Sequence, residues 1–323
     1  MSMEQQNRTV CVTGAGGYVA SWLVKLLLSH NYNVVGTVRD PENEKYAHLK
    51  KLGDEENQLK LVKADLLDYQ SILAAVNGCH GVFHVASPVP SSSVPNPQVE
   101  LVEPAVNGTL NVLRACSASN IKRVVVVSSV SAVMMNPNWP EDQVIDENCW
   151  SDADYCKTTN NWYSYSKTVA EIEALEYAKM NGLNVITLLP SLVLGPMLQQ
   201  AANASSLVLI NLMAEGYEEI ENRPRPIVDV RDVAEALLLV YEKPEAEGRY
   251  ICHSHHSSNG EMVDILRKHY PNYRYPKRFI EAKKREKYSS EKLQKLGWTY
   301  RPLEETAMDS VASYKQGGFL SDS

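Results

Sequence analysis

The chain has 323 residues, which is enough for one large domain or two coupled ones. Hydrophobic residues make up 44% and charged residues 22%, and this composition excludes a disordered chain. With 32 Lys and Arg against 39 Asp and Glu, the formal net charge is −7, so a basic face for nucleic acid or anionic lipid is not expected. The longest apolar run near the N-terminus, residues 19–28, is too short to span a bilayer. We therefore expect a cytoplasmic protein that binds neither nucleic acid nor membranes.

The six cysteines contain no C-x-x-C pair. In the cytosol thiols stay reduced by default, and a chain of this size needs no disulfide bonds for stability. Cys149 and Cys156 are the only near pair, and we interpret them as two unpaired thiols.

Short apolar runs alternate with amphipathic segments over the first 190 residues. Strands are predicted at residues 10–13, 33–38, 59–63, 81–86, 123–128 and 185–189. Helices are predicted at residues 18–29, 68–76, 99–117 and 163–180. The run at 123–128 contains four consecutive valines, as expected of a strand buried on both faces. This alternation predicts an α/β fold with a doubly wound parallel sheet and a ligand crevice at the carboxyl ends of its strands.

After Pro190 the pattern loosens. Proline-containing breaks at 195–196 and 223–226 flank helical stretches, and a helix at 230–241, a strand at 249–252 and a helix at 261–269 follow. We expect residues 1–190 to form the large, cofactor-binding domain. Residues 191–323 should mainly form a smaller substrate lobe over the crevice, with some chain returning to the large domain. The basic run 277–287 is predicted to be a solvated surface segment.

A glycine-rich turn lies between the first predicted strand and helix. Gly14, Gly17 and Ala20 fit the pattern G-x-x-G-x-x-A, whereas the three-glycine fingerprint fails because its third position is Val19. Glycines let the backbone approach a pyrophosphate, and the helix N-terminus supplies free N–H groups. The sequence therefore predicts a dinucleotide site.

Two neighbouring residues at the end of the second strand point to different dinucleotides. Asp40 would accept a hydrogen bond from the 2′-hydroxyl of NAD, whereas Arg39 would pair with the 2′-phosphate of NADP. We favour Arg39, assisted by Lys45, because two cations suit a dianionic phosphate. Asp65, at the end of the third strand, is then placed to contact the adenine amino group.

A candidate catalytic pair lies on the predicted helix at 163–180. Tyr163 and Lys167 are four residues apart and share one helix face. A lysine ammonium lowers the pKa of a nearby phenol, which can then give its proton to an alkoxide formed by hydride transfer. Ser129, after the valine strand, is placed to polarise a carbonyl oxygen. Ser128 and Ser131 compete for the serine role, and Tyr165 competes for the tyrosine role.

Two further features of the sequence, a group of histidines and one asparagine, each have two possible interpretations. Residues 253–256 contain three histidines, which we interpret as a surface loop rather than a metal site, so no metal is predicted. Asn107, on the helix at 99–117, either orients Lys167 through a water molecule or is a polar residue of helix packing.

With these motifs the chain resembles the plant extended short-chain dehydrogenases/reductases. The similar segments include VTGAGGYVASWLVKLLL at 12–28, GVFHVASPV at 81–89, VVVVSSVSAV at 124–133 and NWYSYSK at 161–167. The resemblance covers nearly the whole chain and is strongest in the branch of dihydroflavonol and cinnamoyl-CoA reductases. Within it the chain is similar to cinnamoyl-CoA reductase-like proteins of the short-chain cinnamyl-alcohol dehydrogenase type.

The resemblance implies a Rossmann domain, NADP(H), and Ser129, Tyr163 and Lys167 as the catalytic triad. The residues then expected to bind the cofactor are Gly14, Gly16, Gly17, Tyr18, Val19, Arg39, Lys45, Asp65, Leu66, Ala86, Ser87, Tyr163, Lys167, Pro190, Leu192, Val193 and Ser205.

The chain departs from the resembled family at several polar positions. True cinnamoyl-CoA reductases carry NWYCYGK, so Ser164 here replaces a cysteine able to pair with the one at Cys156. They also use a histidine, a lysine and an arginine where this chain has Val208, Asn211 and Asn259.

The departures favour the reduction of a free, aromatic, cinnamaldehyde-type aldehyde, for which we expect NADPH as the cofactor. We also expect a role in phenylpropanoid and lignin metabolism and a monomer or weak dimer. The alternatives are a cinnamoyl-CoA reductase and a flavonoid-type ketone reductase. Arg39 argues against a nucleotide-sugar epimerase, which would hold NAD. The presence of both Tyr163 and Lys167 argues against a cofactor-sensing regulator.

Overall fold

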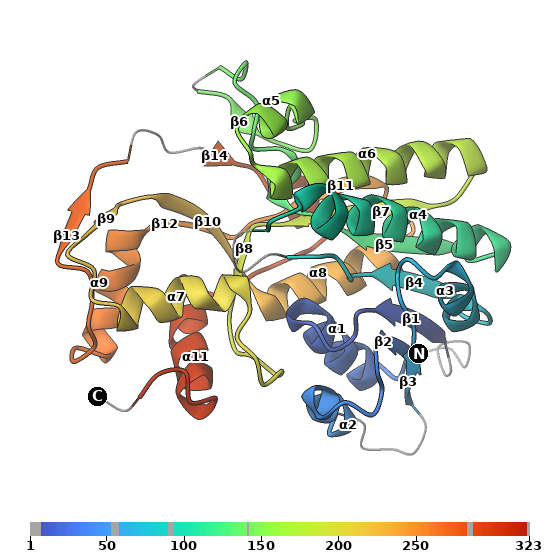
Figure 1. The fold of residues 1–323 in the computed structure, drawn as a ribbon, viewed down its shortest axis with the longest axis horizontal. Coiled ribbons are helices and arrows are strands. Elements are labelled where there is room, and N and C mark those ends of the chain that lie inside the picture. The colour runs from blue at the N-terminus through green and yellow to red at the C-terminus, as the bar shows by residue number, and fades with distance from the viewer. Residues whose placement is uncertain (1–7, 53–57, 90–93, 141, 283–286, 322–323) are drawn as a thin grey trace.

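A parallel sheet forms the centre of the large lobe (Figure 1). The computed structural model describes residues 8–52, 58–89, 94–140, 142–282 and 287–321. The sheet has seven strands in the order β11-β7-β5-β4-β1-β2-β3. Their bounds are β1 Thr9–Thr13, β2 Asn33–Val38, β3 Leu59–Lys63, β4 Gly81–His84, β5 Arg123–Val127, β7 Val185–Pro190 and β11 Gly248–Cys252. The predicted doubly wound parallel sheet is confirmed, and its strand order reverses beside β1, where ligands bind in such folds.

Helices cover both faces of this sheet. On one face lie α1 (Tyr18–Ser29) and α8 (Val230–Glu242), and on the other lie α3 (Tyr69–Val76), α4 (Glu103–Ala118) and α6 (Trp162–Asn181). The valine strand explains the arrangement, because successive side chains of a strand point to opposite faces. Val125 packs in the core beneath α1 and α8, while Val124 and Val126 pack beneath α3, α4 and α6.

Local capping chemistry sets several boundaries. Asp68 is the N-cap of α3, where its carboxylate accepts hydrogen bonds from the backbone N–H groups of residues 70 and 71, so the predicted helix starts one residue later than expected. A π-helical turn, Gln98–Val102, precedes α4 where one continuous helix was predicted. The short helix α2 spans Ala47–Lys50, and two 3₁₀ turns span Glu44–Tyr46 and Val130–Ala132.

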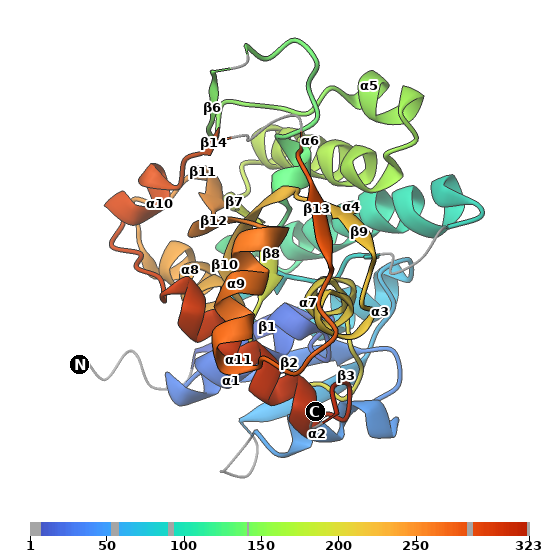
Figure 2. The same cartoon turned by 90° about the vertical axis from the view of Figure 1, so that its left-hand side faces the viewer.

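The smaller lobe lies at the carboxyl side of the sheet (Figure 2). A three-stranded sheet, β12-β10-β8, carries α7 (Ala204–Ala214), α9 (Asn259–His269) and α11 (Leu303–Gln316) around one apolar core. Its strands are β8 Leu192–Leu194, β10 Pro224–Asp229 and β12 His255–Ser258. The remaining elements are β6 Val144–Ile145, paired with β14 Lys287–Tyr288; β9 Glu219–Glu221, paired with β13 Arg278–Ile280; and the helices α5 Ala153–Thr158 and α10 Glu291–Lys295.

The prolines at 223–226 do not form a simple break. Pro224 and Pro226 belong to β10, whose pairing with β8 begins only at Ile227. Before that point β10 pairs with β12 alone, so it is an edge strand where its prolines lie, and an edge tolerates residues that lack an N–H.

Part of the chain after residue 190 returns to the large lobe. Helix α8 packs against α1, and β11 extends the central sheet beside β7. The division of the chain at residue 190 remains a proposal.

The prediction of a surface loop for the three histidines is wrong. His255 and His256 belong to β12, and His253 is 6% exposed. The rings of His253 and His256 lie 4.5 Å apart, and both contact the Tyr288 ring. Within the described ranges no cluster of three metal-ligating side chains is found.

The basic run 277–287 is exposed where it is described. The side chain of Lys277 is 68% exposed and forms an ion pair with Glu218, and Arg278 forms one with Glu219. Residues 283–286 lie outside the described part of the chain. All six cysteines are buried and unpaired in the structure.

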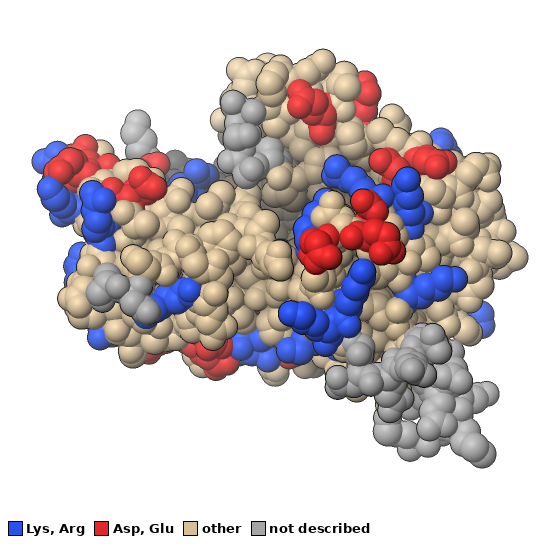
Figure 3. Space-filling view, turned by 60° about the horizontal axis from the view of Figure 1, so that its bottom comes forward, with Lys and Arg blue, Asp and Glu red and all other residues tan. Residues whose placement is uncertain are grey.

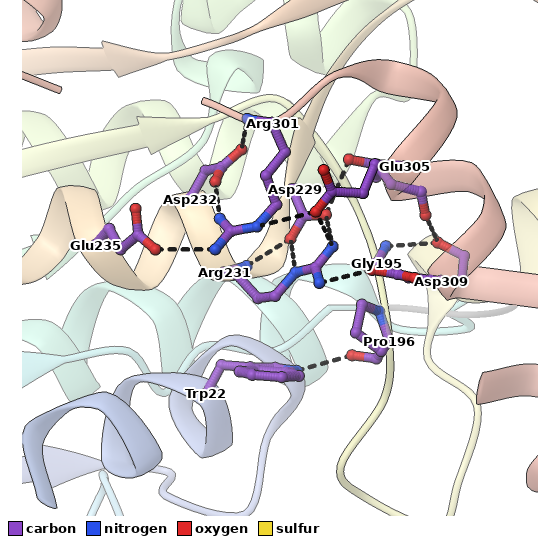
Figure 4. A network of polar contacts seen from close by, with 12 residues as sticks. Trp22, Gly195, Pro196, Asp229, Arg231, Asp232, Glu235, Arg301, Glu305 and Asp309 are labelled. Atoms are coloured by element: carbon purple, nitrogen blue, oxygen red, sulfur yellow. Dashed lines mark hydrogen bonds and ion pairs between the residues drawn. The ribbon is translucent and has the colours of Figure 1, made fainter. Parts of the chain in front are cut away.

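An ionic network around the buried Asp229 links α11 to the start of α8 (Figure 4). Asp229, whose side chain is fully buried, accepts hydrogen bonds from the Arg231 side chain and from Thr306 Oγ1. Arg231 also reaches Asp309 at 2.6 Å. Beside it, Ser310 Oγ accepts a hydrogen bond from the backbone N–H of Gly195, and the carbonyl of Pro196 accepts one from Trp22 Nε1. The network therefore connects α1, α8, α11 and the segment after β8.

Replacing Arg231 with Met is expected to lower the free energy of unfolding by about 3 kcal/mol, because it leaves the Asp229 carboxylate buried without its cation. Chemical denaturation would measure the loss. The matched control is Lys277→Met, which breaks an exposed pair and should cost less than about 1 kcal/mol. Equal losses in the two variants would contradict this interpretation.

Candidate active site

One large cavity opens at the carboxyl ends of the central strands, with a volume of about 980 Å³. It runs from the glycine-rich turn across β2, β4 and β5 to α6 and the start of α7. The structure brings together at this cavity the predicted residues Gly14, Gly16, Gly17, Tyr18, Val19, Arg39, Lys45, Asp65, Leu66, Ala86, Ser87, Ser129, Tyr163, Lys167, Pro190, Val193 and Ser205.

Leu192 is the exception among the predicted residues. It does not line the cavity, and its side chain packs against the apolar core of the smaller lobe. Leu192 and Val193 are neighbours in β8, where successive side chains point to opposite sides, so the lining residue Val193 packs against the core of the large lobe instead.

The glycine-rich turn leaves no room for side chains. Gly14 has φ +65°, and a Cβ there would lie 2.9 Å from the Cβ of Ala86. A Cβ on Gly16 would lie 2.3 Å from the Tyr46 ring. Gly17 is the N-cap of α1 and has no side chain to cap the helix, so the first N–H groups of α1 remain available to an anion. These features fit the pyrophosphate of a dinucleotide.

The two residues at the end of β2 differ in position. Arg39 is exposed and lines the cavity, whereas Asp40 does not line it and its Oδ1 accepts a hydrogen bond from the backbone N–H of Glu42. Lys45 lines the cavity beside Arg39, with its Nζ 4.8 Å from the centre of the Tyr46 ring. The cavity therefore presents two cations, and no carboxylate from Asp40, after the end of β2, where the sequence predicts the adenosine ribose.

Asp65 and Leu66 form the next part of the rim, after β3. Asp65 is exposed, and its Oδ1 accepts a hydrogen bond of 2.9 Å from the backbone N–H of Leu67. Leu66 packs over Gly108 of α4, and its carbonyl accepts a hydrogen bond from Asn111 Nδ2. These contacts fix the rim, and both Asp65 and Leu66 line the cavity there.

Ser129, Tyr163 and Lys167 meet at the inner end of the cavity. Ser129 is the N-cap of the 3₁₀ turn after β5, and its Oγ accepts a hydrogen bond from the backbone N–H of Ser131. Tyr163 and Lys167 lie one turn apart on α6, with Lys167 Nζ 6.0 Å from the centre of the Tyr163 ring. Lys167 is 6% exposed, and its Nζ donates a hydrogen bond of 3.4 Å to the carbonyl of Val127.

The competing residues have other partners. Ser128 Oγ donates a buried hydrogen bond of 2.7 Å to Glu171. Tyr165 packs its ring against Trp162 and under the ammonium of Lys157. Asn107 is exposed on α4 and does not line the cavity, so neither alternative considered for it matches the structure.

Burial shifts the pKa values of both α6 groups toward their neutral forms. It raises the pKa of the Tyr163 phenol, and a hydrogen bond from Ser129 acts in the opposite direction. Burial also lowers the pKa of Lys167 to about 8, although the charge of Glu171 favours the ammonium. At neutral pH the site holds a protonated phenol beside a lysine that is mostly charged.

Sequence reasoning missed several lining residues. Ser191 follows Pro190 and is 6% exposed, and its Oγ has no hydrogen-bond partner within the described part of the chain. Thr37 lines the cavity and accepts a hydrogen bond from the backbone N–H of Gly14 through its Oγ1. Ser191 could have been found because it directly follows a predicted strand. Tyr46, which also lines the cavity, could not, because its contact with the glycine turn depends on how the chain between β2 and β3 folds back.

No helix in the part of the chain that the structure describes is long and apolar enough to cross a membrane.

Comparison with known proteins identifies the scaffold. The model of the NAD dependent epimerase/dehydratase family matches residues 10–253. The chain is 46% identical to cinnamoyl-CoA reductase 1 of Petunia hybrida, over 97% of this chain and 94% of the relative. It is 42% identical to tetraketide alpha-pyrone reductase 1 of Arabidopsis thaliana, over 99% of both chains.

Solved structures agree with this result. Vestitone reductase from alfalfa superposes with a TM-score of 0.82 and 30% identity, covering 97% of this chain and 99% of that one. The yeast methylglyoxal/isovaleraldehyde reductase, solved as a complex with NADPH, gives a TM-score of 0.84 and 25% identity, covering 97% and 100%. The Rossmann fold, the nicotinamide dinucleotide and the reductase class predicted from the sequence are thereby confirmed. The chain belongs to the NAD dependent epimerase/dehydratase family, in the plant extended short-chain dehydrogenase/reductase branch that includes the cinnamoyl-CoA reductases.

Proposed function

We propose that this protein reduces an aromatic, cinnamaldehyde-type aldehyde to its alcohol with NADPH. The observation that carries the proposal is the shortage of cations where a substrate would enter. Beyond Ser129 and Tyr163, the cavity is lined by Val89, Pro104, residues 199–205 and one carboxylate, Glu100. A flat, uncharged aldehyde suits such a lining.

The surface around the entrance supports the same conclusion. Figure 3 shows a hollow between the two lobes, and on its left, over the smaller lobe, the adjoining surface is formed by residues other than Lys, Arg, Asp and Glu. Charged side chains gather on the other side, over the large lobe. Coenzyme A carries several phosphate charges, and its productive binding needs cationic or hydrogen-bonding groups near the entrance.

The three positions at which thioester reductases place His, Lys and Arg are uncharged here. Val208 and Asn211 lie half-buried on α7. Asn259 begins α9, and its Nδ2 donates a hydrogen bond of 2.8 Å to the carbonyl of Glu221, so it serves the local structure of the lobe. None of the three lines the cavity.

When bound, NADPH supplies the hydride that reduces the carbonyl carbon. The Tyr163 phenol donates its proton to the oxygen that becomes the alcohol, and the Ser129 hydroxyl hydrogen-bonds to that oxygen. The Lys167 ammonium stabilises the phenolate left behind and holds the nicotinamide ribose. The glycine turn receives the pyrophosphate, Arg39 and Lys45 the 2′-phosphate, and Asp65 the adenine.

A cinnamoyl-CoA reductase is the second candidate, because a relative that is 46% identical over nearly the whole chain carries that name. The same catalytic triad would serve both reactions. The two candidates differ in how the rest of the substrate is held and in the product, because reduction of a thioester expels the CoA thiol and gives an aldehyde, whereas reduction of an aldehyde gives an alcohol.

NADPH oxidation measured with a panel of aldehydes, ketones and CoA thioesters tests the proposal. Rapid turnover of cinnamaldehyde-type substrates, with the alcohol identified as product by chromatography, is expected. Turnover restricted to ketones or to thioesters would contradict it.

Replacing Arg39 with Ala is expected to lower kcat/KM for NADPH by about ten- to a hundredfold, because a charge-assisted hydrogen bond contributes roughly 1.5–3 kcal/mol. NADH, which lacks the 2′-phosphate, should be used almost as before. Steady-state kinetics with both cofactors measures the effect, and an equal loss for NADPH and NADH would show that Arg39 does not contact the phosphate.

A further inference from the structure

A fully buried carboxylate lies on the catalytic helix behind the site. Glu171 follows Lys167 by one turn of α6, and its side chain has no exposed surface. Its two oxygens accept four hydrogen bonds. Oε1 accepts from Thr187 Oγ1 at 2.7 Å and from Arg249 Nε at 2.8 Å, and Oε2 accepts from Ser128 Oγ at 2.7 Å and from Arg249 Nη2 at 3.3 Å.

The four donor atoms belong to three residues that lie in, or directly after, strands of the central sheet. Thr187 belongs to β7 and Arg249 to β11, while Ser128 follows the last residue of β5. Ser128 is also the neighbour of Ser129 in the chain, and its backbone N–H donates to the carbonyl of Leu188. One carboxylate therefore ties the helix that carries Tyr163 directly to the strand end that carries Ser129.

Arg249 extends the connection to the segment before α5. Its Nη1 donates to the carbonyls of Glu147 and Cys149 at 2.8 and 2.6 Å, and its guanidinium stacks on the Trp150 ring at 3.4 Å. Because both oxygens of this carboxylate have hydrogen-bond partners, the Glu171 side chain is held in one conformation. The same contacts fix the position of α6.

Lys167 shares a small cavity with the same carboxylate. A cavity of about 10 Å³ is lined by Lys167, Glu171, Ser128, His84 and Thr109 among others, and this size admits one water molecule. Of the titratable groups, Tyr163 and Glu171 face Lys167 from its own helix and His84 faces it from β4, while α4 presents only the Thr109 hydroxyl.

His84 contributes no charge there. Thr13 Oγ1 accepts hydrogen bonds from the backbone N–H groups of residues 85 and 86, so its own proton goes to His84 Nδ1 at 2.9 Å. Thr109 donates its proton to the carbonyl of Ala105 and therefore accepts from His84 Nε2. Burial and the Lys167 charge lower the pKa of His84 to about 3, so it stays neutral. Glu171 is thus the charged group that faces Lys167.

We propose that Glu171 is a positioning residue that holds Ser129, Tyr163 and Lys167 in one reactive arrangement and keeps Lys167 charged. This inference rests on the proposed function for the roles of those three residues. A buried ion pair adds little net stability over an apolar replacement, so its geometric precision is the property to be tested. Displacement of catalytic groups by about 1 Å can cost about a hundredfold in rate.

The test is Glu171→Gln, which keeps the side-chain shape but replaces one of the two acceptor oxygens with an NH2 donor and removes the charge. We expect kcat for aldehyde reduction to fall at least about tenfold, with a smaller change in KM. The alkaline limb of the kcat profile should move to lower pH by about one unit, because Lys167 then loses its proton earlier. Glu171→Asp retains the charge and should keep the alkaline limb in place.

The matched control is Asp232→Asn, a carboxylate 1% exposed and paired with Arg301, which does not line the cavity. It should lower the melting temperature but leave kcat within about twofold and the pH profile unmoved. If Glu171→Gln does not fold, the double variant Glu171→Gln/Arg249→Gln, which leaves no buried charge unpaired, should show the same loss of kcat. A double variant that also fails to fold, or a folded Glu171 variant with unchanged kcat and alkaline limb, would overturn the proposal.

A second readout separates this inference from the proposed function. In protein with isotope-labelled lysine, the NMR signal of Lys167, assigned by its absence from Lys167→Ala, should titrate at lower pH in Glu171→Gln than in the unmodified protein. This measurement needs no substrate. If the unmodified protein reduces no aldehyde, the proposed function fails, while an unmoved Lys167 titration overturns the inference itself.

Discussion

Replacing Tyr163 with Phe is expected to lower kcat for aldehyde reduction by at least about a hundredfold, the lower part of the range for loss of a general acid. The ring and its packing remain, and only the hydroxyl is lost. After hydride transfer the new alkoxide must take a proton, and Tyr163 is the phenol that lies beside Ser129 at the inner end of the cavity. Single-turnover kinetics measures the chemical step directly.

Cofactor binding provides the control for this variant. The dissociation constant of NADPH should change little in Tyr163→Phe, because the glycine turn and Arg39 are untouched. Lys167→Ala should instead weaken both turnover and NADPH binding, since Lys167 also holds the ribose. Retained activity in Tyr163→Phe would move proton donation to Tyr165 or to water.

Introducing the three cationic positions of the thioester reductases is expected to create activity on CoA thioesters. The variant Val208→His/Asn211→Lys/Asn259→Arg supplies three charged contacts, each worth about 1.5–3 kcal/mol, so kcat/KM for a hydroxycinnamoyl-CoA should rise by several powers of ten if they added fully. Neighbouring contacts seldom add fully, so a smaller rise is the practical expectation. Steady-state kinetics with aldehyde and thioester measures both changes.

The structure supplies a control for this experiment. Asn259→Arg removes the hydrogen bond to the Glu221 carbonyl, so the melting temperature is measured beside activity, and Val208→His/Asn211→Lys is made separately. Aldehyde reduction should change little in either protein. A triple variant that is folded and active on aldehydes but gains no thioester activity would show that these positions do not control the choice of substrate.

The sequence was sufficient for the large lobe because its elements are long and regular. The valines of β5 and the apolar spacing of α1 repeat the period of their structure, and the glycine turn marks the crevice. The smaller lobe was harder to predict. Its strands β8, β9 and β12 have three or four residues each, and the prolines of β10 indicate a break until its pairing with β12 is known.

Some residues of the site could likewise be predicted from the sequence, and others could not. Ser129, Tyr163 and Lys167 could be found from spacing, because they follow a strand or share a helix face. Glu171 and Arg249 could not be paired from the sequence, because the contact joins α6 to a strand that returns from the second half of the chain. The histidines of 253–256 were assigned to the surface because polarity alone does not reveal that Tyr288 packs over them.

The most direct test is the ratio of kcat/KM for a hydroxycinnamaldehyde to that for the corresponding hydroxycinnamoyl-CoA thioester, measured on the unmodified protein with saturating NADPH. The absence of His, Lys and Arg at positions 208, 211 and 259 predicts a ratio of at least about tenfold in favour of the aldehyde, which is the effect of one missing charged contact, and a larger ratio to the extent that the three losses add. Comparable efficiency on both substrates would contradict the account and make cinnamoyl-CoA reduction the better description of this protein.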